Sequence, residues 1–120
     1  MIRLILPWPP SVNHYWRRWN GRTIISREGR AYREHVARAI RTLGADRRLA
    51  GRLAVEMLLF PPDRRRRDID NLSKALLDAL QAAGVYEDDN QIVVLHIERR
   101  DATRGGRVEV AVNEFKEEGQ

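Results

Sequence analysis

Two aspartates separated by a single residue are the side chains in this sequence that point most directly to chemistry. Asp68 and Asp70 lie in the segment 64–74, RRRRDIDNLSK. In extended backbone the side chains at i and i+2 point to the same side, and paired carboxylates are hard oxygen ligands suited to Mg²⁺ or Mn²⁺. Asp70 opens a predicted helix, so Lys74 follows one turn later on the same face. The segment therefore predicts a metal and phosphate site at a helix N-terminus.

A second acidic cluster, 87–89, follows that helix and precedes a predicted strand. If this turn folds back toward Asp68 and Asp70, three carboxylates converge on one cation. A metal held in this way activates a water molecule and offsets the charge that develops on a phosphate during hydrolysis. The pattern thus favours a metal-dependent phosphodiester enzyme over a passive binding protein.

Each of these features also has a simpler interpretation. Asp70 is a suitable helix cap, a role worth about 1 kcal/mol that competes with a metal for its oxygens. Asp88 and Asp89 are common turn residues. Lys74 is an exposed helix charge that can pair with Asp70 or Asp78. It is the combination of the features that favours an enzyme.

The charge of the chain is compatible with a nucleic-acid partner. Lysine and arginine total 22 against 17 acidic residues, which gives a net charge of +5, and only Lys74 and Lys116 are lysines. Arginine has a planar guanidinium that pairs with phosphate through two hydrogen bonds. A general bias of the proteome toward arginine would give the same composition. The positions of the arginines must therefore decide whether they bind a nucleic acid.

Those positions include a second basic segment near the N-terminus. Residues 13–22, NHYWRRWNGR, alternate aromatic and basic side chains. Arginines such as Arg17 and Arg18 can grip phosphates, and an aromatic ring can stack on an unpaired base. We assign Trp8 to the edge of the core and Trp19 to the stacking role.

The elements that must position these residues follow from hydrophobic periodicity and from the turn residues. We expect strands at 2–6, 53–60, 92–98 and 107–112, with a short further strand at 22–25. Helices are expected from the cap Ser26 to Leu43 and from Asp70 to Ala83, each followed by a glycine. A hairpin turn at 103–106 joins the last two strands.

This order, β-(β)-α-β-α-β-β, indicates one α/β or α+β domain at 1–115, with two helices packed on a small mixed sheet. The sheet order is left open, and 116–120 is expected to be a disordered tail. Cysteine is absent, which excludes disulfides and thiolate metal sites. No segment approaches the roughly 18 apolar residues of a membrane span, and we expect a cytoplasmic protein with no membrane partner.

The sequence resembles the endodeoxyribonuclease RusA family of Holliday-junction resolvases. The resemblance rests on Leu6-Pro7-Trp8-Pro9-Pro10-Ser11 with Asn13, on the segment 64–74, and on Asp88-Asp89 with Gln91. It extends from Leu4 to about Val112, and it implies a homodimer that resolves four-way DNA junctions by paired, symmetric nicks with Mg²⁺ or Mn²⁺.

The resemblance also assigns roles to residues. It implies that Asp68, Asp70 and Asp89 are the essential carboxylates and metal ligands and that Lys74 is the essential lysine, whereas Asp88 is not expected to be a ligand. It implies DNA contacts along 11–14 and 64–71. Together with the basic segment, the predicted DNA contacts are Ser11, Asn13, His14, Arg17, Arg18, Arg64, Arg65, Arg66, Arg67 and Asn71.

One departure from the family pattern lies at the end of the strand 92–98. Relatives commonly carry a lysine there, and this chain has Arg99 followed by Arg100. A guanidinium is not a point charge, which puts any specific role of that position in doubt.

Two other functions stay open from the residues alone. One is a non-catalytic, structure-specific DNA-binding protein, and the other is a metal-dependent nuclease that acts on flaps or RNA.

Overall fold

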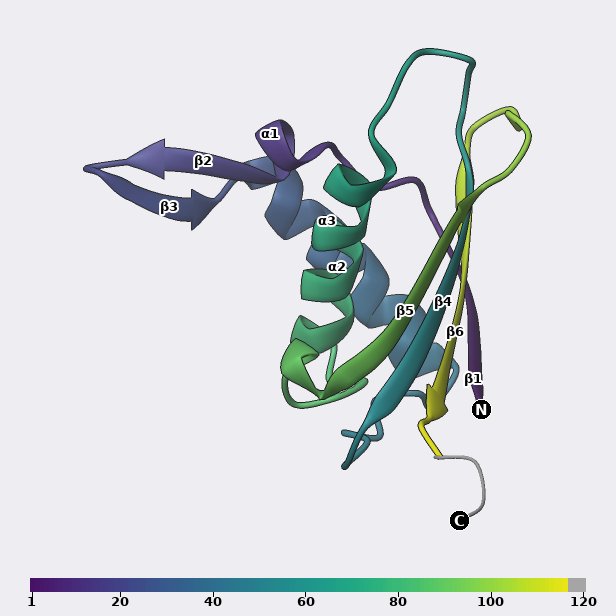
Figure 1. Ribbon diagram of the computed structural model, residues 1–120. Coiled ribbons are helices and arrows are strands. Elements are labelled where there is room, and N and C mark those ends of the chain that lie inside the picture. Colours follow the sequence, from purple (N-terminus) through teal and green to yellow (C-terminus); the bar gives the residue numbers. More distant parts are fainter. Residues whose placement is uncertain (117–120) are drawn as a thin grey trace.

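A computed structural model describes residues 1–116 of the chain as a mixed sheet with two long helices on one face (Figure 1). The sheet contains β1 (Ile2–Leu6), β4 (Leu53–Phe60), β5 (Ile92–Arg99) and β6 (Arg107–Glu114), in the order β1-β6-β4-β5. Strands β4 and β5 are parallel, and the β1/β6 and β4/β6 pairs are antiparallel. The predicted α+β domain with a mixed sheet is confirmed.

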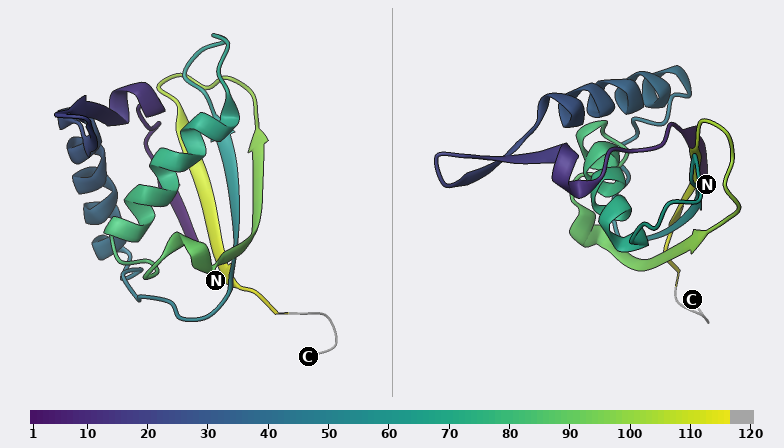
Figure 2. Two further views of the ribbon diagram at one scale, coloured as in Figure 1. Left: turned by 60° about the vertical axis from the view of Figure 1, so that its left-hand side comes forward. Right: turned by 90° about the horizontal axis from the view of Figure 1, so that it is seen from above.

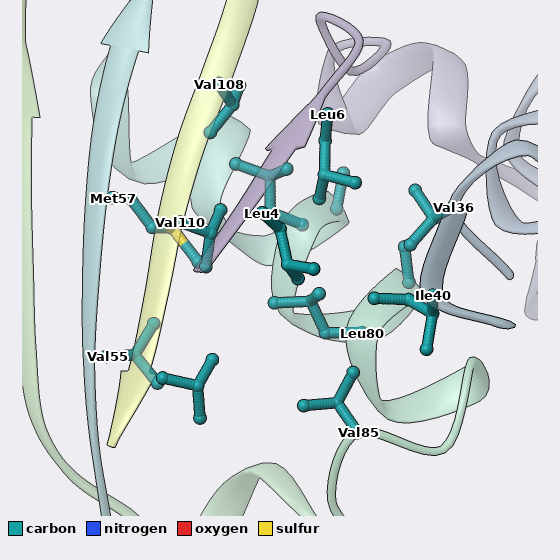
Figure 3. Packing of buried hydrophobic residues seen from close by; sticks show 14 of the residues in the cluster. Leu4, Leu6, Val36, Ile40, Val55, Met57, Leu80, Val85, Val108 and Val110 are labelled. Carbon is teal, nitrogen blue, oxygen red and sulfur yellow. The ribbon is translucent and has the colours of Figure 1, made fainter. Parts of the chain in front are cut away.

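The helices α2 (Arg27–Thr42) and α3 (Ile69–Ala82) pack side by side on this sheet (Figure 2). Alternate residues of β1, β4 and β6 are buried, because successive side chains of a strand point to opposite faces. Figure 3 shows side chains from these strands meeting Val36 and Ile40 of α2 and Leu80 of α3. Burial of one such side chain contributes about 1.5–3 kcal/mol.

Strand β4, helix α3 and strand β5 form a parallel βαβ unit. Parallel neighbours need a long crossover connection, which α3 supplies. The helix runs opposite to the strands that it joins, so its N-terminus lies at the carboxyl ends of β4 and β5. Its C-terminus lies beside the start of β5, where the 3₁₀-helix η1 (Asp89–Gln91) leads into the strand.

The predicted hairpin between the last two strands is wrong. The turn at 103–106 exists, with a hydrogen bond from Gly106 N to Thr103 O (2.8 Å). However, β4 lies between β5 and β6, so this connection crosses the end of β4 instead of closing a hairpin. The backbone N–H groups of Arg100 and Thr103 bond to carbonyls at the end of β4, Leu59 O and Pro61 O.

The N-terminal segment, residues 7–21, contains regular structure where the sequence predicts neither a helix nor a strand. It contains the short helix α1 (Val12–Tyr15) and the strand β2 (Trp16–Trp19). The short strand β3 (Arg22–Ile25) pairs with β2 in a separate two-stranded sheet and does not join the main sheet.

The helix boundaries agree with the prediction at the start of α2 and differ from it by one residue at the start of α3. Ser26 caps α2 as predicted, its hydroxyl accepting from Gly29 N at 2.9 Å, while α3 begins at Ile69, one residue earlier than predicted. The predicted disordered tail lies outside the described residues except for Lys116. None of the helices within residues 1–116 is both long and apolar enough to cross a bilayer.

Candidate active site

The N-terminus of α3 holds the two paired carboxylates. Asp68 is the N-cap residue in extended backbone, and Asp70 lies in the first helical turn. Both residues are exposed, and Asp68 makes no side-chain cap hydrogen bond. The capping interpretation is therefore not supported, because neither side chain is used to close the helix end.

Asp68 and Asp70 line one open hollow of about 320 Å³, together with Arg67, Ile69 and Arg99. The helix N-terminus adds the positive end of its dipole to this hollow. The two acids thus share one space with two guanidinium groups. Carboxylates and cations in one hollow suit a divalent metal together with a phosphate.

Arg99 is the residue of this hollow that sequence reasoning did not assign. It is the last residue of β5, and the βαβ connection places the carboxyl end of that strand beside the N-terminus of α3. The position of Arg99 could have been predicted, since a strand, a helix and a strand of suitable lengths in succession are typical of a parallel βαβ unit. Relatives commonly carry lysine at that position, so the family pattern assigns no specific role to an arginine there.

Lys74 is exposed on α3, one turn after Asp70. The alternative pairing with Asp78 does not occur, because Arg33 of α2 binds both carboxylate oxygens of Asp78 at 2.7 and 2.9 Å. Among the residues that the structure describes, no ion pair involves Lys74. Its ammonium group is therefore available on the same helix face as Asp70.

The arginine loop between β4 and α3 divides into one anchoring residue and three exposed ones. Arg67 pairs with Asp63 at 2.8 Å, and its guanidinium lies 5.6 Å from the ring centroid of Trp8. The hydrogen bond from Arg67, with one from the backbone of Arg65, holds the pKa of Asp63 below its usual range. Arg67 thus fixes the loop, whereas Arg64, Arg65 and Arg66 are exposed.

These three arginines line one side of a cleft of about 860 Å³. The opposite side of the cleft comes from the connection after β5, with Arg99 and Arg100. Arg99 lines both this cleft and the hollow that contains Asp68 and Asp70. A nucleic-acid backbone in the cleft would therefore lead directly to the paired carboxylates.

Asp89 lies at the opposite end of α3 from Asp68 and Asp70. A 14-residue helix at 1.5 Å per residue is about 21 Å long. Within residues 1–116, no three side chains of His, Asp or Glu gather closely enough to hold a metal ion. The fold-back of the acidic turn that would unite three carboxylates does not occur within one chain.

The turn that carries Asp89 is nevertheless well ordered. Gln91 accepts hydrogen bonds from the backbone N–H groups of Glu87 and Asp88, each at 3.0 Å, and donates to Leu49 O and Gly51 O. Asp88 caps η1 by accepting from Asn90 N at 2.9 Å. Asp88 is therefore occupied as a cap, while Asp89 stays exposed at the start of the helix.

The predicted N-terminal DNA contacts lie on α1 and β2, at the same end of the molecule as the start of α3 (Figure 1). Asn13 and His14 are exposed, and Ser11 bonds His14 Nδ1 at 3.0 Å. Arg17 and Arg18 are exposed on β2, and Asn71 is exposed in the first turn of α3. The structure thus places these side chains on the surface, with Trp8 packed against the core as predicted.

Comparison with known proteins is decisive for the family. The family model of endodeoxyribonuclease RusA matches residues 7–113. The chain belongs to the RusA family. Crossover junction endodeoxyribonuclease RusA of Escherichia coli (strain K12) is 46% identical over 115 residues, which cover 96% of this chain and 96% of that protein. The RusA protein of Enterobacteria phage 82 is 47% identical, with the same coverage.

In this RusA-family chain, we expect Arg99→Ala to slow cleavage of a four-way junction about tenfold. One charge-assisted hydrogen bond to phosphate contributes about 1.5–3 kcal/mol, and part of it is lost again to solvent at this exposed position. The variant should also lower the slope of log affinity against log salt by about 1. Single-turnover cleavage and binding titrations at several salt concentrations measure both effects.

Two matched variants test whether the effect is local. Arg99→Lys keeps a cation at the position and should retain most of the activity. Arg38→Ala removes the same charge from the exposed face of α2 and should leave the cleavage rate unchanged. Equal losses in Arg99→Ala and Arg38→Ala would mean that only net charge matters.

Proposed function

We propose that this chain is a crossover junction endodeoxyribonuclease that resolves four-way DNA junctions by paired nicks in opposing strands. The observation that carries the proposal is the hollow at the start of α3, where Asp68 and Asp70 lie beside Arg99. Family membership supports the reaction, since the relatives bear the name of this activity. DNA is present in the cytoplasm, and we propose that location.

The donor set of the hollow fits a divalent cation such as Mg²⁺, for which Mn²⁺ can substitute. Magnesium binds through one or two carboxylates and completes its shell with water and substrate phosphate oxygens. Asp68 and Asp70 supply two exposed carboxylates of this kind. When bound, the ion would lower the pKa of a water molecule and offset charge on the scissile phosphate.

The remaining steps belong to the side chains of the chain itself. Arg99 and the exposed arginines 64–66 hold the DNA backbone in the cleft and bring the scissile phosphate to the carboxylates. Lys74 presents its ammonium group one turn beyond Asp70, where it stabilises the negative charge that develops on the phosphate oxygens. The N-terminus of α3 acts in the same direction.

We further propose that the enzyme is a homodimer joined through the edge of β5. This strand ends the sheet, and its outer edge is not paired within the described chain. Val93, Val94 and Leu95 are 44%, 44% and 41% exposed. Because neighbouring residues of a strand point to opposite faces, a partner at the edge would cover apolar surface on both faces.

A two-fold axis at this edge would complete the metal site. Asp89 directly precedes β5, and the hollow with Asp68 and Asp70 lies beside Arg99 at the end of β5. Antiparallel pairing of two β5 strands sets the start of one against the end of the other. Asp89 of one copy would then approach Asp68 and Asp70 of the second copy. A dimer of this kind would carry two equivalent sites for the two opposing strands.

The experiment that tests the function is cleavage of a synthetic four-way junction in Mg²⁺ and in EDTA. We expect paired, symmetric nicks in Mg²⁺ and none in EDTA. Duplex, flap and RNA substrates of equal length serve as competitors, and we expect them to compete weakly. Preferential cutting of flaps or RNA would replace the proposal with a different nuclease. Junction binding without nicks in Mg²⁺ would make the protein an architectural one.

A further inference from the structure

The β2–β3 hairpin, residues 16–25, extends from the body as an arm and takes no part in the active site described above. Its two strands pair only with each other. Figures 1 and 2 show the arm reaching away from the helices and the sheet. It leaves the body through α1, which packs against α3. In Figure 1 the arm starts at the same end of the molecule as α3.

One face of the arm combines an exposed indole with two arginines. Trp19 is 58% exposed, which is unusual for so large an apolar side chain. Trp19 pairs across the hairpin with Arg22 and lies two residues from Arg17, so all three side chains share a face. The guanidinium of Arg17 lies 5.6 Å from the ring centroid of Trp19. The opposite face carries Trp16 and Ile25, which pack against the core.

The positive charge of the arm favours a polyanion as its partner. The arm carries Arg17, Arg18 and Arg22 and no acidic residue, and the first acidic residue of the whole chain is Glu28. A surface made of aromatic rings and arginines, without acids, matches the faces of nucleic-acid bases and the phosphates beside them. A protein surface as partner would need acidic residues of its own to match.

The tip of the arm is conformationally fixed. Asn20 and Gly21 both have positive φ, 49° and 72°, as a tight two-residue hairpin turn requires. Asparagine followed by glycine is the sequence that best tolerates this turn. Trp19 directly precedes the turn, so the position of its backbone is set by the hairpin and not by a loose loop.

The base of the arm is fastened to both long helices. Ser26 directly follows β3, and its backbone N–H and hydroxyl both donate to Tyr15 O at 2.9 Å. Gly29 of α2 packs so closely here that an added Cβ would lie 2.7 Å from Ile25 Cγ1 and closer still to Tyr15 O. The absence of a side chain at Gly29 therefore lets the arm rest on α2.

A buried polar cluster holds the same base against α3. The hydroxyl of Tyr15, a fully buried side chain, donates to Asp78 of α3, which Arg33 of α2 also binds. Burial, reinforced by the hydrogen bond to Asp78, raises the pKa of Tyr15 above its usual range, so the phenol stays a donor. The guanidinium of Arg33 lies 5.8 Å from the ring centroid of Trp16, the first residue of β2. The direction of the arm is thus set by contacts with both helices.

We propose that the arm stacks Trp19 on an unstacked base at the branch point of the DNA junction, while Arg17 and Arg22 bind the flanking phosphates. The inference rests on the proposed function, because a branch point offers base faces that a continuous duplex keeps inside its stack. The arm thereby contributes to the choice of branched over unbranched DNA. It does not take part in the hydrolysis.

The test compares Trp19→Ala with wild type in EDTA, on a four-way junction and on a duplex of equal length. We expect the dissociation constant for the junction to rise about tenfold, at the lower end of what loss of one aromatic stack costs. Duplex affinity should change by less than about twofold, because the phosphate contacts remain. With 2-aminopurine at the branch point, wild type should change the probe's fluorescence on binding, and Trp19→Ala should not.

Two further variants complete the design. Trp19→Phe keeps a ring and should recover most of the junction affinity. Leu43→Ala removes a side chain of matched exposure, 57%, at the end of α2 and should behave as wild type. Because Trp19 lies on the surface, the melting temperature of Trp19→Ala should equal that of wild type, which shows that the substitution does not destabilise the body of the protein.

Several results would overturn the inference. Unchanged junction affinity in Trp19→Ala, or an equal loss on junction and duplex, would remove the stacking role. A shift in the dimer dissociation constant would assign the arm to contacts with a second copy. If wild type cuts junctions and only the Trp19 effects fail, the proposed function stands without this inference. If wild type shows no preference for junctions, the result contradicts both the proposed function and the role of Trp19.

Discussion

Asp70→Asn is expected to abolish junction cleavage while leaving junction binding intact or slightly tighter. The substitution keeps the size of the side chain but removes an anionic ligand from the hollow at the start of α3. We expect the cleavage rate to fall by at least about 1000-fold, which corresponds to about 4 kcal/mol of lost transition-state stabilisation. In EDTA the affinity should rise up to about fivefold, since one carboxylate charge near a phosphate contributes about 1 kcal/mol of repulsion.

A matched control separates ligand loss from charge loss. Asp101 is exposed and lines the neighbouring arginine cleft, but it does not line the hollow. Asp101→Asn should therefore tighten binding by a similar small factor and should keep its cleavage rate. Gel-shift titration and single-turnover cleavage of the same labelled junction measure both quantities. Wild-type cleavage by Asp70→Asn would remove this aspartate from the proposed metal site.

The sequence predicted the helices and strands themselves better than it predicted which strands lie next to each other in the sheet. Alternating apolar residues and helix caps such as Ser26 are local signals, and the structure has those elements near the predicted bounds. Strand order depends on contacts between distant segments, which no local pattern records. The turn at 103–106 has the residues of a hairpin turn, yet β4 lies between the two strands that it joins.

Half of the N-terminal arm was missed for a related reason, since the strand at 22–25 was expected but its partner β2 was not. Arg17 and Arg18 within β2 carry long polar side chains on both faces, so the strand shows no alternation of apolar and polar residues. The Asn20-Gly21 pair was the one local signal of a two-residue hairpin. The buried Tyr15, which helps to fix the arm, makes its contacts with Arg33 and Asp78 in the two long helices, far along the chain.

In the candidate site, too, residues within one short segment could be predicted from the sequence, whereas residues brought together by strand pairing could not. Asp68, Asp70 and Lys74 share one short segment, and their common position could be predicted from helix geometry. The place of Arg99 depends on the parallel pairing of β4 and β5. The position of Asp89 at the far end of α3 follows from that same βαβ connection, which excludes the fold-back allowed by the sequence.

That separation leads to the second large expected effect: two inactive variants should restore nicking when they are mixed. Asp70→Asn leaves Asp89 intact, and Asp89→Asn leaves Asp70 intact. If each site combines Asp68 and Asp70 of one copy with Asp89 of the other, a mixed dimer contains one fully intact site. After random exchange, about a quarter of all sites are intact, because half of the dimers are mixed and each has one good site.

The product distribution gives a further signature. A mixed dimer has a single working site, so it should nick one strand of the junction and leave the opposing strand whole. Wild type should yield paired nicks and linear duplex products in the same assay. Denaturing and native gels of one reaction distinguish a nicked junction from a resolved one.

The control mixes two variants whose defects lie in the same half of the site. Asp68→Asn and Asp70→Asn both alter the segment at the start of α3. Any mixed dimer of these two has a defect in each site, so the mixture should stay as inactive as its components. Restoration in the first mixture and none in the second requires that a carboxylate cross from one copy to the other. If exchange is demonstrated and neither mixture nicks DNA, Asp89 does not complete the site of a second copy, and its predicted role as a metal ligand is lost with it.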